Sequence, residues 1–170
     1  HQSKAKLEEV ILCYEKALIL GLAEADQLLH AEVLEILGHA YRRLGQCERA
    51  IDWYLEKIKY YPLRAFWARY LVGLIYCERL NKPHEAYEIL KDAPHAINCD
   101  LSYLHRVYGL LAALSFYFQN ESAAKYFAKL ALKAGENAKQ TDRFMQRALT
   151  LLALYAALEN DLESSRQYIA

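Results

Sequence analysis

The 170-residue sequence contains little that interrupts a helix, with only three prolines and six glycines. It also lacks segments in which apolar and polar residues alternate with period two, the pattern of a half-buried strand. Because 55% of its residues are hydrophobic, the chain can bury a sizeable core, and its length suits one ordinary domain. These features predict an all-α domain of about nine helices, joined by short turns so that neighbouring helices pack antiparallel.

Neither sign of charge is in excess, because 21 lysines and arginines balance 21 aspartates and glutamates. Proteins that bind nucleic acids use a surplus of basic side chains, so we expect no nucleic acid partner for this segment. No apolar run approaches the roughly 20 residues that a membrane-spanning helix needs, and no signal peptide is visible in the sequence. We therefore expect a cytoplasmic protein that does not associate with membranes.

The motifs of catalytic and cofactor sites are also missing. The four cysteines form no C-x-x-C pair, the six histidines form no H-E-x-x-H motif, and no glycine-rich phosphate loop occurs. We expect reduced, mostly buried cysteines, no metal or cofactor, and no enzymatic activity. The start at His1 instead of methionine and the uncapped end at Ala170 predict that the chain is a piece of a longer protein.

The stretch over residues 34–62 places small residues where two helices would meet. The residues that share the facing sides of its two predicted helices, together with the proline that ends the second, are Leu34, Leu37, Gly38, Tyr41, Ala50, Tyr54 and Pro62. Gly38 and Ala50 would let the two helix backbones approach closely, while Tyr41 and Tyr54 fill the space beside them. The stretch is therefore predicted to be a tightly packed helical hairpin.

This set of residues resembles the tetratricopeptide repeat, a helix–turn–helix unit of about 34 residues. Only Lys57 departs from the pattern, because a small residue is usual at that position. Fainter copies follow at spacings of 35, 39 and 41 residues, marked by Gly38, Gly73, Ala112 and Ala153. We therefore expect a single repeat domain over residues 1–170, folded as a right-handed α-α superhelix. Its expected units are 1–25 (partial), 31–64, 66–100, 101–136 and 140–170.

The resemblance implies a function as well as a fold. Stacked helix pairs form a superhelix with a concave inner face, and such faces bind segments of other proteins. We therefore expect a non-catalytic scaffold that binds a peptide, a helix or a sister domain. Two alternatives remain open: the array is the ligand- or peptide-sensing segment of a larger signalling or transcription regulator, or two copies of the chain associate.

The resemblance also implies which side chains face inward, because fixed positions of each first helix line the concave face. The expected partner-binding residues are Glu35, His39, Arg42, Arg43, Trp67, Tyr70, Leu71, Leu74, Arg106, Phe116 and Tyr117. Further inward positions in the third and fourth units are Gly109, Leu110, Ala113, Arg147, Thr150, Leu151, Leu154, Ala157 and Leu158. The face is expected to be polar and partly cationic in the first full unit and apolar to aromatic beyond it. Alternatively, Trp67 and Phe116 pack between repeats or against a flanking domain.

Overall fold

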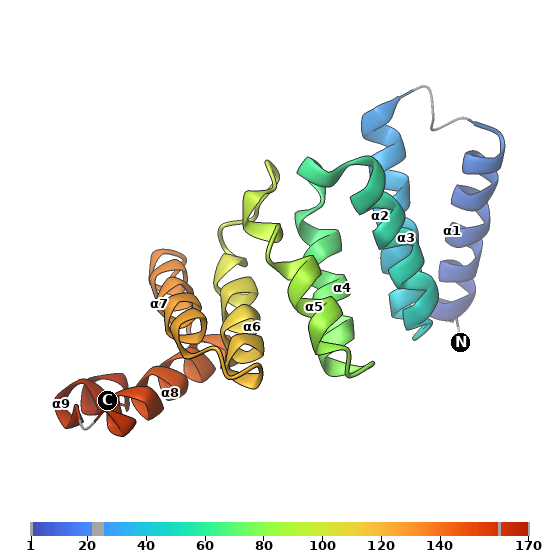
Figure 1. Ribbon diagram of the computed structural model, residues 1–170. Helices are drawn as coiled ribbons and strands as arrows, with labels where there is room; N and C mark the ends of the chain where they lie inside the picture. The colour runs from blue at the N-terminus through green and yellow to red at the C-terminus, as the bar shows by residue number, and fades with distance from the viewer. Residues whose placement is uncertain (1, 22–25, 160, 170) are drawn as a thin grey trace.

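The protein is a row of helices that follow one another in the order of the sequence, with the two termini at opposite ends (Figure 1). The computed structural model describes residues 2–21, 26–159 and 161–169, in which there are nine α-helices and no strand. The α-helices are α1 (Gln2–Ile19), α2 (Gln27–Arg43), α3 (Cys47–Tyr60), α4 (Phe66–Glu78), α5 (Pro83–Leu90), α6 (Leu104–Tyr117), α7 (Glu121–Asn137), α8 (Arg143–Leu158) and α9 (Leu162–Ile169). Two short 3-10 helices, η1 (Pro62–Arg64) and η2 (Ala93–His95), lie in the connections. The all-α prediction is confirmed.

Small residues allow close contact within the helix pairs, as the hairpin stretch predicted. Gly38 of α2 faces the ring of Tyr54 in α3, and a Cβ added at Gly38 would lie 2.4 Å from the ring carbon Cε1. Gly73 of α4 makes the equivalent contact with α5, where an added Cβ would lie 2.4 Å from Cγ of Leu90. In both pairs a large side chain of the second helix therefore occupies the space that the glycine of the first helix leaves.

The longer spacing from Gly73 to Ala112 has a structural cause in the connection between α5 and α6. After α5, residues 91–103 turn through η2 and return towards the start of α4. The N–H of Ile97 donates to the carbonyl of Leu63 at 2.7 Å, and Oδ1 of Asn98 accepts from the N–H of Phe66 at 3.2 Å. The extra residues thus satisfy backbone groups at the N-terminal end of α4.

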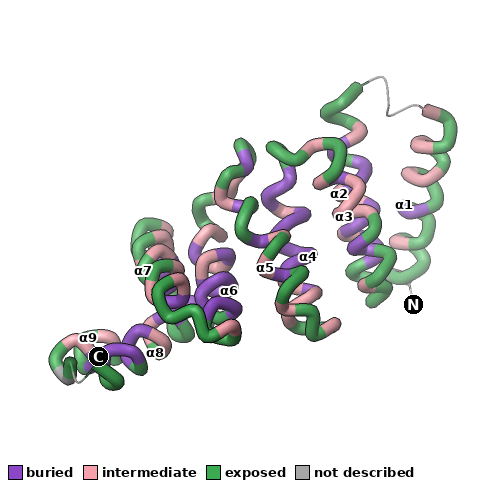
Figure 2. The backbone as a smooth tube through the Cα atoms, viewed as in Figure 1, coloured by how far each residue is buried: buried purple, intermediate pink, exposed green. Residues whose placement is uncertain are grey.

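Buried residues follow the seams between helices, most densely on α4 and α6 (Figure 2). The larger core cluster spans α1 to α6, with Phe144 of α8 added at its end. A smaller cluster joins α6, α7 and α8 and consists mostly of alanine: Ala112, Ala128, Ala131, Ala148 and Leu152. Because alanine side chains are short, these three helices can pack closely, and helix α6 touches both α7 and α8.

The prediction of mostly buried cysteines is wrong. Cys13 is exposed, and Cys47, Cys77 and Cys99 are only partly buried. A row of helix pairs that is two helices deep has few fully enclosed positions, so these side chains remain near the surface. All four thiols are free. Burial, helped by the charge of Glu78, raises the pKa of Cys77 to about 11, so this thiol is protonated at neutral pH.

We expect Gly38→Ala to lower the free energy of unfolding by about 1–3 kcal/mol, because the added methyl group overlaps the Tyr54 ring. Alanine is the better helix former, so a propensity effect alone would have the opposite sign. Urea unfolding followed by circular dichroism measures the change. In the double variant Gly38→Ala/Tyr54→Leu, the smaller leucine side chain leaves room for the added methyl group. The double variant should therefore lose less free energy of unfolding than the two single variants lose in sum. Strictly additive losses would contradict the steric explanation.

Candidate functional site

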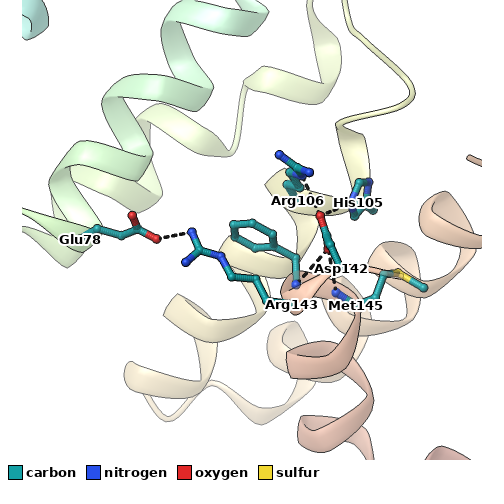
Figure 3. A network of polar contacts seen from close by, with 7 residues as sticks. Glu78, His105, Arg106, Asp142, Arg143 and Met145 are labelled. Carbon is teal, nitrogen blue, oxygen red and sulfur yellow. Dashed lines mark hydrogen bonds and ion pairs between the residues drawn. The ribbon is translucent and has the colours of Figure 1, made fainter. Parts of the chain in front are cut away.

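Asp142 joins α6 to α8 through four hydrogen bonds (Figure 3). Its Oδ1 accepts from the backbone N–H groups of Phe144 at 3.0 Å and Met145 at 3.4 Å, which caps the first turn of α8. Its Oδ2 accepts from Nε2 of the fully buried His105 at 3.0 Å and from Nε of Arg106 at 2.8 Å. Because His105 and Arg106 belong to α6, one carboxylate fixes the start of α8 against that helix.

The surroundings of Asp142 keep it ionised. Partial burial on its own raises the pKa of this carboxyl group. The hydrogen bonds from His105 and the Phe144 N–H, together with the charge of Arg106, outweigh burial and hold the pKa below its usual range. At neutral pH the carboxylate is therefore negative, which also suits its position at the N-terminus of a helix.

Two further contacts bring α4 into the same assembly. The guanidinium of Arg106 lies 4.5 Å from the ring centroid of Tyr103, and the Tyr103 ring packs against Trp67 with centroids 4.7 Å apart. Separately, Nη2 of Arg143 at the start of α8 donates to Glu78 at the end of α4 at 2.8 Å (Figure 3). The first helices of three successive pairs, α4, α6 and α8, are thus linked by named side chains.

The structure divides the expected partner-binding residues by exposure. Tyr70 is only 4% exposed and Leu71 is also buried, while Trp67 is half-buried in its contact with Tyr103. Leu74 is half-buried and packs against the larger core cluster. The Trp67 contact corresponds to the alternative of packing between repeats. Tyr70 and Leu71 are therefore not part of the surface that a partner can reach.

The polar positions of α2 line a cleft of about 350 Å³ against α3 and the connection that contains Asn98. Within the cleft Glu35 pairs with Lys57, and Nδ1 of His39 lies 2.7 Å from the hydroxyl of Tyr54. Burial lowers the pKa of Lys57 to about 8, although the negative charge of Glu32 acts in the opposite direction. Several polar groups of this cleft are thus already satisfied within the protein.

Arg42 and Arg43 lie exposed in the last turn of α2, outside the lining of this cleft. Burial, and then the charges of these two arginines, lower the pKa of His39 from its ordinary value. His39 is therefore neutral at pH 7. The two arginines expected on the inner face of this unit thus lie at the exposed end of α2, whereas the basic residues that line the cleft are Lys57 and Arg64.

A separate, apolar groove of about 290 Å³ lies between α6 and α8. It is lined by Gly109, Ala112, Ala113, Phe116, Arg147, Ala148, Thr150, Leu151 and Leu154. Small residues of α6 leave room for the groove, and the larger side chains at its edges are accessible: Phe116 is 45% exposed and Leu154 is 43% exposed. An adjoining hollow shares Phe116 and extends to Tyr117, which is also exposed.

All lining residues of this α6–α8 groove except Ala112 and Ala148 hold positions that the repeat pattern predicts to face inward. Sequence reasoning missed the Asp142 network beside it. Asp142 and His105 are 37 residues apart and share no motif, so their spacing does not reveal the contact. The only usable signal is an aspartate directly before a helix, which predicts a cap but not its partner on α6.

Comparisons with known proteins bear on the fold alone. No protein-family model matches the chain, and no curated protein matches it. Among solved structures, BtubC (BKLC) from P. vanneervenii is similar with a TM-score of 0.69 at 17% identity, over 99% of this chain and 72% of that one. The MamA RS-1 ArsTM double mutant has a TM-score of 0.61 at 17% identity, over 96% of this chain and 90% of its own. The chain therefore has a helical repeat-like fold.

No helix in the described part of the chain is both long and apolar enough to span a membrane. No group of three or more histidine, cysteine, aspartate and glutamate side chains in residues 2–21, 26–159 and 161–169 is placed to hold a metal ion.

We expect Asp142→Asn to lower the free energy of unfolding by about 1–3 kcal/mol at neutral pH, because His105 and Arg106 lose a charged acceptor. The folded-state pKa of Asp142 is depressed, so its contribution is present above the unfolded value near 3.9 and is lost as the pH falls through the folded value. Urea unfolding should therefore show the gap between wild type and variant shrinking from about pH 6 to about pH 3. Asp52→Asn, at an exposed position of α3, is the control. A gap that does not shrink would contradict the role given to Asp142.

Proposed function

We propose that this chain is a divergent tetratricopeptide-type domain, with four full units and one partial unit, whose function is to bind another protein along the α6–α8 groove. Three observations support the repeat assignment: the residue pattern around Gly38, the equivalent glycine contact at Gly73, and the row of helix pairs. The protein acts as a non-catalytic scaffold, because the groove presents apolar surface without the pairs of titratable groups that general acid–base chemistry uses.

The observation that carries this proposal is the set of large apolar side chains left exposed around the groove. Phe116 and Tyr117 on α6, and Leu154 on α8, are all exposed. Exposed apolar surface gathered in one place is typical of a site that binds a partner. Burial of one such side chain contributes about 1.5–3 kcal/mol, so two or three of them can supply much of a specific affinity.

The links between α6 and α8 also favour binding. Asp142 holds the start of α8 against α6, so the two sides of the groove are already positioned before a partner arrives. Binding to a pre-formed surface loses less conformational entropy than binding to a mobile one. The α2–α3 cleft supports partner binding less well, because Glu35, Lys57 and His39 are already paired there.

We expect the double variant Phe116→Asp/Leu154→Asp to bind partner peptides about tenfold more weakly or worse, since that loss equals about 1.4 kcal/mol. The probes are peptides of about 15 residues, enough for about four helical turns, sorted from a random displayed library on the fluorescently labelled wild-type protein. Affinities are then measured by fluorescence polarisation, with circular dichroism as the check on folding.

Tyr126→Asp is the matched control, because Tyr126 is a large side chain of α7 that is 59% exposed and does not line the groove. It should leave the affinities unchanged. A folded Phe116→Asp/Leu154→Asp variant that binds every sorted peptide as tightly as wild type would contradict the proposed function.

A further inference from the structure

The α6–α8 groove offers very few hydrogen-bonding groups to a partner. Its lining residues belong to the interiors of two helices, whose backbone N–H and C=O groups are paired along each helix. The hydroxyl of Thr150 already donates to the carbonyl of Gln146 at 2.8 Å. Arg147 is the one charged residue in the lining.

Because the groove offers so few hydrogen-bonding groups, it favours one backbone conformation of the partner. An extended segment in the groove would bury N–H and C=O groups without hydrogen-bond partners, which is unfavourable. Extended peptides are commonly bound by pairing with a sheet edge, and the part of the chain that the structure describes contains no strand. A helical partner satisfies its own backbone groups and can present a purely apolar stripe to the groove.

Arg147 indicates the charge of the partner. The neighbouring Arg106 and Arg143 are occupied by Asp142 and Glu78 respectively. Arg147 is exposed, and none of the described acidic residues forms an ion pair with it. A guanidinium group binds a carboxylate through two parallel hydrogen bonds, which adds geometric specificity to the charge. A carboxylate on the partner therefore has a complementary group beside the apolar lining.

We propose, on the basis of the protein-binding role above, that the groove binds an amphipathic α-helix of another protein that carries an aspartate or glutamate directed at Arg147. Its apolar side chains pack against Phe116, Leu151 and Leu154. From Gly109 to Phe116, helix α6 rises about 10 Å, which corresponds to about two turns of the partner. Because Arg147 lies one to two turns before Leu151 and Leu154 on α8, its ion pair also fixes which end of the partner's apolar stripe lies near the start of α8.

The sequences of the library peptides sorted on the wild-type protein test this proposal. We expect enriched peptides to have apolar residues at spacings of three and four and to include an acidic residue. Their affinity for the Arg147→Glu variant should be about tenfold lower than for the wild-type protein. A peptide in which lysine replaces the acidic residue should bind the Arg147→Glu variant with restored affinity. A proline in the middle of the peptide should abolish binding, because it breaks the helix. Lys129→Glu, at an exposed position of α7, is the charge-matched control and should have no effect.

The possible failures can be told apart. Enriched peptides that are proline-rich, that alternate with period two, or that bind Arg147→Glu undiminished overturn the acidic-helix proposal. If Phe116→Asp/Leu154→Asp still loses those peptides, the proposed function survives. A library that yields no enriched peptide, or only peptides that bind the double variant equally well, overturns both.

Sedimentation velocity of the protein alone tests whether a second copy of the chain occupies the groove. We expect a monomer at all concentrations, unaffected by Phe116→Asp/Leu154→Asp. A dimer that this double variant dissociates would make a second copy of the chain the occupant and would overturn the proposal.

Discussion

Asp142 contacts two helices at once with a single side chain. As the cap of α8 it satisfies N–H groups that would otherwise have no partner, and with its second oxygen it holds α6 through His105 and Arg106. Since His105 is fully buried, loss of this acceptor would leave a polar group without compensation inside the packed region. The relative placement of α6 and α8, and with it the groove between them, depends on this carboxylate.

The features that the sequence predicted well are those encoded over short distances. The 3.6-residue period and the scarcity of proline predict helices, and Gly38 marks a close contact because a larger side chain at that site is excluded by Tyr54. The inward positions on α6 and α8 come from the resemblance to the repeat, and they stay a prediction. Phe116 and Leu154, which the repeat pattern places on the inward side, both line the groove.

The features that the sequence did not predict depend on residues far apart in the chain. Tyr70 is buried because the long connection between α5 and α6 brings the Tyr103 ring towards Trp67, and helical periodicity says nothing about the path of that connection. In the same way Lys57, the one departure from the repeat pattern, is buried against Glu35 of the neighbouring helix. Each pairing needs the fold before it can be recognised.

The chain thus presents two different surfaces, a polar α2–α3 cleft with many internal pairs and an apolar α6–α8 groove with one unpaired cation. The most direct test of partner binding in the groove is a titration of isotopically labelled protein with a sorted peptide, followed by backbone amide NMR. We expect the shifted resonances to cluster at residues 109–117 of α6 and residues 147–154 of α8. A cluster in the α2–α3 cleft or on the outer side of α7 would contradict the assignment of the groove.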